Sequence, residues 1–473
     1  MTLDSLHRRE AIKLLAGVTA AGIALSPGRS QTSVTKKIII AGAGIGGLCC
    51  AYELMRRGHE VTVLEAAGRS GGHILTIRDG LADGLYADAG AEHFYRPGYD
   101  MFWRYLYEFQ LPVIPYPRRE RMVRYIMGKP YTEEMLADRA VLRNFELNQK
   151  EIDYLLRNPW PEFSQLYYGR YLDSFHDEYR PFDAGLNDLD HLTITEFLRR
   201  EGASPAAIGF LGGDSSALYA IWFHAIKKRR GMQQFVKNVF RVRGGNQRLT
   251  DAFATKLGER LHLACPLTAI EHGATGVTVH YTEAGRSKKV EADYLVSCMS
   301  LVALRNIPVT PDWPESRRYI VTHMPYDSYG RAIFQSRTRF WETDGVSPNQ
   351  EFPSAALSDV WRTADEVESP RGLLIGTAPL GSAEKALATF RKFYTGRADD
   401  IEQALAVDWV HDSRASACLP IAYAPGELAK FWPEIIKPCG RIHFAGVYAD
   451  NLTFGMEAAV RSASRVAEAI HAA

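Results

Sequence analysis

The stretch KKIIIAGAGIGGLCCAYELMRRG, residues 36–58, decides the fold of this chain. It begins with a run of β-branched residues, continues through a glycine-rich turn into a helical pattern, and ends at Gly58. This order is typical of a strand, a tight turn, a helix and the glycine that caps it. Val61–Leu64 predicts a second strand, and Glu65 stands at its end.

Each part of this stretch has a physical task in binding a dinucleotide. Gly42 allows the tight turn, Gly44 lets backbone amides approach a pyrophosphate, and Gly47 permits close packing of helix on strand. Glu65 is placed to accept hydrogen bonds from ribose hydroxyls. Because its carboxylate would repel a 2′-phosphate, the stretch predicts NAD or FAD.

A second glycine turn, AAGRSGGH at residues 66–73, separates these two cofactors. It lets the chain return against the same pyrophosphate, and dehydrogenases that use free NAD lack it. Together with Glu65, the turn resembles the E-x-x-x-R-x-G-G-R segment of the flavin-containing amine oxidase superfamily. That superfamily includes monoamine, polyamine and L-amino acid oxidases and is related to protoporphyrinogen oxidase and phytoene desaturases.

The resemblance continues in the correct order along most of the chain. DAGAE at residues 88–92 is similar to a segment whose backbone passes beside the flavin, and VRGGNQRL at 242–249 looks like the return from the substrate domain. Residues 277–279 and 292–296 match the paired strands that re-enter the FAD domain. RIHFAG at 441–446, with the GMEAA that follows it, resembles the closing strand and helix.

The resemblance implies an α/β fold, in which an FAD-binding, Rossmann-like (two-dinucleotide-binding) domain is interleaved with an α+β substrate domain. Residues 33–110, 237–300 and 405–473 are predicted to form the FAD-binding domain. Residues 111–236 and 301–404 are predicted to form the substrate-binding domain, the first part mostly helical and the second a mixed sheet. We expect Thr193 or Thr195 to cap a helix in the first part.

The resemblance also implies which residues contact FAD. They come from the two glycine turns, the segment at 90–93, Leu267 before the paired strands, the end of the closing strand and the start of the last helix. The predicted cofactor-binding residues are Gly42, Gly44, Ile45, Gly46, Gly47, Glu65, Ala66, Arg69, Gly71, Gly72, His73, Gly90, Ala91, Glu92, His93, Leu267, Gly446, Val447, Gly455, Met456 and Ala459.

The chain departs from the family at the position of a lysine that binds a water at flavin N5. Counting back from the Phe340-Trp341 pair, that position holds Arg331. Arginine keeps its charge and presents a planar fork, so it can order a water or grip a carboxylate but cannot serve as a tunable base. An exposed or salt-bridged arginine is the alternative.

A second departure concerns two aromatic rings that flank the amine above the flavin. Gly455 stands where one ring is usual, so Phe454 or Tyr448 is left as a substitute, or neither. Tyr423 is the candidate for the other ring, with packing in a turn as the alternative. Val447 replaces the acid after F-A-G, for which Asp450 is a substitute. The predicted catalytic residues are Arg331, Tyr423 and Phe454.

The leading hypothesis is an FAD-dependent oxidoreductase that oxidises an amine or amino acid by hydride transfer to flavin N5. The alternative is an FAD-dependent desaturase, dehydrogenase or isomerase of a non-amine apolar substrate, which Arg331 and Gly455 favour. A flavin-binding protein without enzymatic activity is the third reading. His93 and His224 are weak candidates for handling protons.

Composition limits the partners. The 473 residues include 56 basic and 55 acidic side chains, a net charge of +1, so no overall field attracts nucleic acid. The six cysteines form no C-x-x-C pair or His spacing that would hold a metal. We therefore expect a small-molecule substrate, no nucleic acid and no metal, with a homodimer as a further expectation.

Residues 1–32 resemble a twin-arginine export signal. Arg8 and Arg9 precede an apolar stretch, Leu14–Leu25, that Ser26-Pro27-Gly28 ends. At about 12 residues, the stretch is short of the roughly 17–25 that span a bilayer, so no stable membrane span is expected. The signal predicts the twin-arginine machinery as a partner and a periplasmic location for the folded protein. Its cleavage stays open, and an amphipathic N-terminal helix is the alternative.

Overall fold

The computed structural model describes residues 34–233, 238–412, 419–420, 422–452 and 455–473. Contacts divide the chain into a unit of residues 1–34 and a unit of residues 35–473. The larger unit holds every element described below. The predicted export signal lies outside the described residues.

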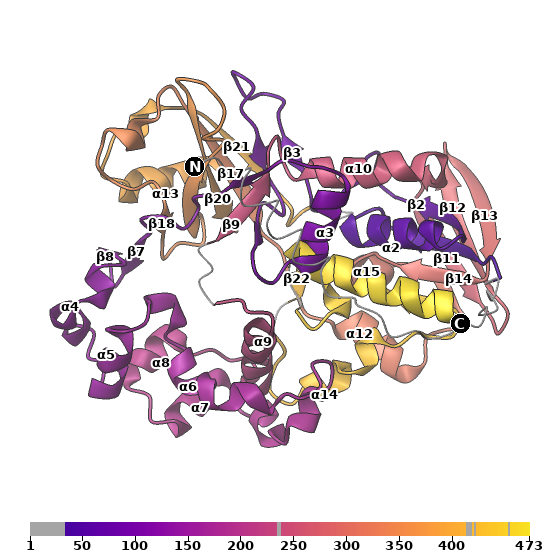
Figure 1. Cartoon of the computed structure of the whole chain (residues 1–473), viewed down its shortest axis with the longest axis horizontal. Helices are drawn as coiled ribbons and strands as arrows, with labels where there is room; N and C mark the ends of the chain where they lie inside the picture. The colour runs from indigo at the N-terminus through magenta and orange to yellow at the C-terminus, as the bar shows by residue number, and fades with distance from the viewer. Residues whose placement is uncertain (1–33, 234–237, 413–418, 421, 453–454) are drawn as a thin grey trace, which may run out of the picture. The chain divides into compact units, whose positions relative to one another are not determined.

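A five-stranded parallel sheet organises the dinucleotide-binding half (Figure 1). Each neighbouring pair is parallel, and Ile38–Ala41 pairs on both sides. The strand order is β10 (Leu261–His262), β2 (Glu60–Leu64), β1 (Lys37–Ala41), β14 (Tyr294–Ser297) and β23 (Ile442–Phe444). Strands from all three stretches assigned to the FAD domain therefore meet in one sheet.

Helices α2 (Ile45–Arg56) and α15 (Gly455–Ala472) lie side by side in this half, with α10 (Gln247–Leu257) nearby (Figure 1). Helix α2 is buried continuously from Ile45 to Leu54, which accounts for its apolar sequence around the whole circumference. Ala459 of α15 faces Gly46 of α2, so the two backbones come close together there.

A second, four-stranded sheet accompanies the parallel one. Its order is β13 (Arg286–Ala292), β12 (Val277–Glu283), β11 (Leu267–His272) and β15 (Val309–Thr310). Strand β11 begins two residues after Cys265, whose amide donates to the carbonyl of Glu65 (2.7 Å). This sheet is thereby attached to the end of β2.

The substrate half contains a seven-stranded sheet that joins residues far apart in sequence. Strand β17 (Gly330–Ser336), which lies next to an edge strand, is buried at every position and confirms the strand predicted there. On one side of β17 lies the edge strand β21 (Ile401–Val407). On its other side follow, in sheet order, β20 (Gly372–Ala378), β19 (Asp359–Thr363), β18 (Gln350–Glu351), β7 (Val123–Ile126) and β8 (Lys129–Thr132).

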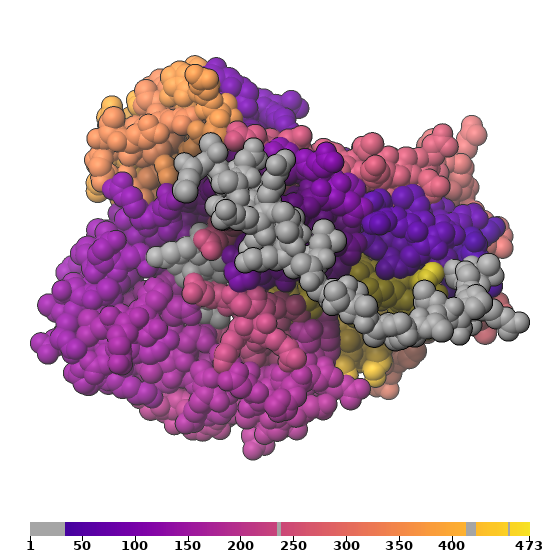
Figure 2. All heavy atoms as spheres, in the orientation of Figure 1, coloured from indigo at the N-terminus to yellow at the C-terminus, as the bar shows by residue number. Residues whose placement is uncertain are grey.

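The loop around Asp83 connects the two halves by lying against this sheet. Figure 2 shows indigo to purple atoms from the early part of the chain beside the orange atoms of the substrate half at the top of the molecule. The Ala82 amide donates to Gln335 Oε1 (2.8 Å), and Arg371 pairs with Asp83 (3.1 Å). The sheet is therefore held against the chain segment that leads to residues 88–92.

The first part of the substrate half is mostly helical, as predicted. Thr193 caps α7 in a capping box with Glu196, which confirms one of the two predicted caps. The helices of this part are α4 (Arg139–Arg143), α5 (Gln149–Leu155), α6 (Gln165–Tyr168), α7 (Ile194–Arg200), α8 (Pro205–Leu211) and α9 (Ala217–Arg229).

Shorter elements complete the fold. The remaining helices are α3 (Asp100–Glu108), α11 (Leu301–Leu304), α12 (Glu315–His323), α13 (Ala383–Phe393) and α14 (Leu428–Phe431). The remaining strands are β3 (Thr76–Ile77), β4 (Ala87–Asp88), β5 (Phe94–Tyr95), β6 (Val113–Pro115), β9 (Val239–Val242), β16 (Tyr326–Asp327) and β22 (Leu419–Pro420). In the described part of the chain, no helix is both long and apolar enough to cross a bilayer.

Candidate functional site

The first glycine turn has the geometry that its sequence predicts. Gly42 has φ +103°, a conformation that side chains rarely adopt. A Cβ added to Gly47 would overlap the carbonyl oxygen of Gly42, so helix α2 packs directly on the turn. A Cβ added to Gly44 would meet nothing within 4 Å, and no side chain caps α2 at this residue. The start of α2 is therefore accessible to a phosphate.

The second glycine turn returns against the first. The Gly71 amide donates to the carbonyl of Ala43 (2.8 Å), and a Cβ on Gly72 would lie 3.2 Å from Gly44 Cα. Glu65 holds both turns, because its carboxylate accepts from the amides of Ala43 (2.6 Å) and Ala67 (2.7 Å). Ala66, the predicted contact beside it, is partly exposed.

Arg69 and His73 share a neighbour that the sequence did not reveal, Trp409. The Arg69 guanidinium donates to the carbonyl of Gly72 (2.8 Å) and lies 6.0 Å from the Trp409 ring, while burial lowers its pKa. The His73 ring meets Trp409 edge-on at 4.9 Å. Trp409 Nε1 donates to the carbonyl of Ala89 (2.8 Å), so this indole joins the second turn to the next segment.

Residues 88–92 pass close to the second turn. A Cβ on Gly90 would overlap the carbonyl oxygen of His73, and the Ala91 amide donates to that same oxygen (2.9 Å). Asn246, in the predicted return segment, donates its backbone amide to Asp88 (2.9 Å) and its side-chain amide to the Ala91 carbonyl (3.1 Å). Two of the family-like segments therefore bond directly to each other.

The closing strand, α2 and α15 meet at small residues. A Cβ on Gly46 would lie 3.4 Å from the carbonyl oxygen of Ala459 and 3.8 Å from Gly446 Cα. Ser462 Oγ bonds to both the amide (2.9 Å) and the carbonyl (3.0 Å) of Gly446. Gly455, the first residue of α15, has φ +74°.

The other predicted contacts lie near these points. Ile45 and Met456 are buried at the starts of α2 and α15, and Val447 follows Gly446 and is partly exposed. Leu267, the first residue of β11, is also partly exposed. Together these features fit a dinucleotide that reaches from the start of α2 to the start of α15. They are the accessible face at Gly44, the Glu65 carboxylate and the two helix starts.

Glu92 and His93 form the centre of a buried charge cluster with Arg118. Arg118 Nε lies 3.3 Å from Glu92 Oε1, and His93 Nδ1 lies 3.0 Å from the same oxygen. Burial alone would raise the pKa of Glu92, but the charges of Arg118 and Arg331 outweigh it and lower that pKa to about 2. Burial and the charge of Arg118 lower the pKa of His93 to about 3.

Arg331 is buried on β17 and faces this cluster, so it is neither exposed nor salt-bridged. It is 5% exposed, and within the described residues no carboxylate lies within 4 Å of it. It donates to Thr377 Oγ1 (2.7 Å) and Gly90 O (3.4 Å), and its buried Nε has no partner. Burial works against its charge, but Glu92 and nearby groups raise its pKa on balance.

Other candidates lie outside the predicted site. Tyr423 is 1% exposed, and its hydroxyl accepts from Trp432 Nε1 (3.1 Å), so its ring packs in the core; its role as a flanking ring stays a prediction. Asp450 is fully buried and bound by Arg461 (3.2 Å) and Tyr179 (3.0 Å), which leaves no free carboxylate for the cofactor. Phe454 lies outside the described residues.

His224 and Tyr448 also pack internally. His224 lies edge-on against Tyr168 at 4.9 Å, and burial lowers its pKa to about 3. Tyr448 is 3% exposed beneath Gly446. Sequence reasoning also missed Arg118 and Thr377, because their contacts with Glu92 and Arg331 join distant segments.

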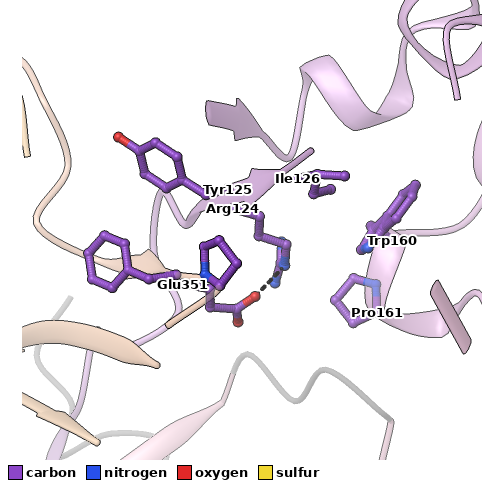
Figure 3. A pocket seen from close by; sticks show the side chains of 8 residues that line it. Arg124, Tyr125, Ile126, Trp160, Pro161 and Glu351 are labelled. Carbon is purple, nitrogen blue, oxygen red and sulfur yellow. Dashed lines mark ion pairs between the residues drawn. The ribbon is translucent and has the colours of Figure 1, made fainter. Parts of the chain in front are cut away.

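A separate cavity of about 360 Å³ opens on the substrate half (Figure 3). The Arg124–Glu351 ion pair (2.8 Å) lies within it, between Tyr125 and Trp160. Its lining is Arg124, Tyr125, Ile126, Trp160, Pro161, Glu351, Phe352 and Pro353. All eight residues come from the predicted substrate domain, so this cavity is not the dinucleotide site.

The model of the flavin containing amine oxidoreductase family matches residues 45–471. The chain belongs to this family. FAD is therefore its cofactor, and the protein is an FAD-dependent oxidoreductase with the α/β fold that the sequence predicted. The glycine turns, Glu65 and the adjoining helix starts fit that cofactor, as described above.

Individual relatives are distant. An L-amino-acid oxidase of Pseudechis australis is 25% identical over 94% of this chain and 89% of its own length. Another, from Notechis scutatus scutatus, is 25% identical with the same coverage. Cyclohexylamine oxidase from Brevibacterium oxydans IH-35A is similar in structure, with a TM-score of 0.75 at 21% identity over 93% of this chain and 99% of its own. Putrescine oxidase bound to putrescine has a TM-score of 0.74 at 21% identity, covering 93% and 100%.

Proposed function

We propose that this oxidoreductase acts on an amine, and that amino acids are the favoured class. Arg331 carries the proposal, because it is a buried guanidinium with an unpartnered Nε and no carboxylate partner in the described chain. The charge of Glu92 stabilises this guanidinium from beyond ion-pair distance, and a substrate carboxylate would give it a direct partner. The curated relatives named above are L-amino-acid oxidases, which supports the same class.

The residues around Arg331 would orient such a substrate. Thr377 and Gly90 hold two of its nitrogens, and its guanidinium lies 5.4 Å from the Trp361 ring. Trp361 and Tyr116 wall off solvent beneath it, since both are buried. Bound FAD would supply the acceptor for the hydride from the carbon next to nitrogen. His93 stays neutral at pH 7 because its pKa is lowered to about 3.

The test is anaerobic bleaching of the FAD-loaded protein by matched substrates. We expect L-amino acids to bleach the flavin faster than amines of the same side chain without the carboxylate, and to release ammonia when oxygen is admitted. Equal rates for both series would remove the carboxylate preference. Protein that stays colourless after reconstitution with FAD would contradict the whole proposal, and Glu65→Ala should weaken FAD retention.

The alternative is oxidation or isomerisation of a non-amine apolar substrate. Arg331 in place of a lysine and Gly455 in place of a ring favour it, because both remove features typical of amine recognition. Bleaching by apolar alkenes without ammonia release would support this alternative over the first.

We also propose export by the twin-arginine machinery to the periplasm. The support is the Arg8-Arg9 pair and the short apolar stretch after it. Changing both arginines to Lys should keep the protein in the cytoplasm, as cell fractionation would show. Normal export of that variant would contradict the proposed twin-arginine signal. The predicted domain boundaries and the homodimer stay predictions.

A further inference from the structure

The start of helix α15 meets a tyrosine that no other part of the site uses. Helix α15 is 18 residues long and begins at Gly455, which has φ +74°. Its first turn presents amide groups that favour an acceptor or a negative charge. A Cβ added to Gly455 would overlap Tyr99 Oη and lie 3.2 Å from Tyr99 Cζ. The phenol thus fills the space that a side chain at position 455 would take.

Tyr99 is buried but incompletely satisfied. It is 2% exposed, and its ring packs edge-on against Tyr95 at 5.3 Å and Phe102 at 6.1 Å. Its hydroxyl makes no hydrogen bond within the described residues. An acceptor at the start of α15 would give this hydroxyl a partner.

Glu457 fixes this arrangement. Its carboxylate accepts from the amides of Met101 (3.1 Å) and Phe102 (2.8 Å), at the start of the helix α3 that Tyr99 precedes. Position 99 is therefore attached to the first turn of α15 through a buried carboxylate. These bonds hold the backbone next to position 99 close to the first turn of α15.

The ligand that reaches this point is the one held by the first glycine turn. A Cβ on Gly46 would lie 3.4 Å from the carbonyl oxygen of Ala459, so the start of α2 touches α15 one turn beyond Gly455. A dinucleotide whose phosphates lie on α2 would extend along this contact to the start of α15. A substrate carboxylate, in contrast, is matched by Arg331 on β17.

We propose that Tyr99 Oη donates a hydrogen bond to the carbonyl edge of the flavin pyrimidine ring at the start of α15. This inference rests on FAD binding as given under the proposed function. Burial raises the pKa of Tyr99, so the phenol stays protonated and acts as a donor. A donor at this edge stabilises the more electron-rich, reduced flavin together with the helix start.

Tyr99→Phe tests the proposal, because it keeps the ring and removes the donor. Sulfite binding, followed by the loss of visible flavin absorbance, should weaken about tenfold in the FAD-loaded variant. For a two-electron couple, a tenfold change corresponds to a fall of about 30 mV in the midpoint potential. Tyr168→Phe is the matched control, since Tyr168 is 3% exposed in the helical part of the substrate half, and we expect its values to equal those of the parent.

Three outcomes separate the possibilities. Parent-like sulfite affinity and potential in Tyr99→Phe with FAD bound would overturn the inference, and so would a change confined to the binding of substrate carboxylates. A parent protein that fails to bind FAD would instead contradict the proposed function. If Tyr99→Phe does not fold, Gly455→Ala displaces the hydroxyl by its Cβ and should lower the potential in the same direction; an unchanged potential there would overturn the inference.

Discussion

The glycine turns and the Glu92 cluster both interact with charged groups, but the turns do so through backbone amides and the cluster through side chains. The turns use backbone amides within residues 42–73, and Glu65 ties them together through bonds to neighbouring residues. The cluster uses side chains from distant segments, with Arg118 and Arg331 placed around Glu92 by separate strands and loops. Local backbone can be inferred from spacing, whereas a buried charge cluster depends on which segments meet.

The largest effect is expected in the cluster, from Glu92→Gln. Removing the carboxylate leaves Arg118 and Arg331 buried without it, which should lower the free energy of unfolding by about 3–5 kcal/mol. Urea unfolding at pH 7 measures it. The control is Glu291→Gln, an exposed partner of Lys289, which should cost less than about 1 kcal/mol.

The same variant makes a pH prediction. The pKa of Glu92 is lowered in the fold to about 2, so its stabilising effect is present above the unfolded pKa and is lost as pH falls through about 2. The difference in the free energy of unfolding between the parent and Glu92→Gln should therefore become smaller only at acidic pH. A difference that stayed constant down to pH 2 would show that the lost contact is not ionic.

In the turns, replacing each of two glycines by alanine should have different effects on stability and on FAD binding. Gly47→Ala collides with the Gly42 carbonyl and should destabilise the fold by about 1–3 kcal/mol. Gly44→Ala meets nothing in the protein, so the melting temperature without FAD should stay near that of the parent while FAD binding weakens. Thermal unfolding and FAD titration compare them. Equal melting temperatures for both variants would contradict the close helix packing.

Arg331→Lys tests whether this arginine of the Glu92 cluster binds a substrate carboxylate. Losing the planar fork should raise KM for an amino acid about tenfold and change kcat little, since lysine keeps the charge but not the paired donors. Steady-state kinetics with Arg337→Lys, an exposed arginine beside the same strand, provide the control. If Arg331→Met is as active as the parent, the residue lies outside the substrate site.

The smallest effect concerns His93. Its pKa is lowered to about 3 in the fold, so between pH 6.5 and 3 the unfolded chain binds a proton that the folded chain does not. This histidine should then make the free energy of unfolding fall by about 1 kcal/mol per pH unit below pH 6, and His93→Gln should remove that part of the slope while His224, whose pKa is also lowered to about 3, keeps its own.

Much of the fold could be predicted, because its signals are local. The β-branched run at 36–41 predicted a strand, and the pattern from Leu48 to Arg57 predicted a helix. The structure has the strand at Lys37–Ala41, the helix at Ile45–Arg56 and the predicted return of the second turn. The resemblance of five ordered segments added the family and FAD, which the comparison with the family model confirmed. Side-chain surroundings could not be inferred in the same way, as Tyr423 and Asp450 show, because both have partners in the core that come from other segments.

By itself, then, the sequence determined the backbone that approaches the cofactor, since glycine spacing restricts φ and the distance between segments within a short stretch. Only the tertiary structure decided what surrounds it. Trp409 against the second turn and Tyr99 against Gly455 come from positions that no local pattern connects. Their contacts arise when separate segments are packed to exclude water, and that packing depends on the whole chain.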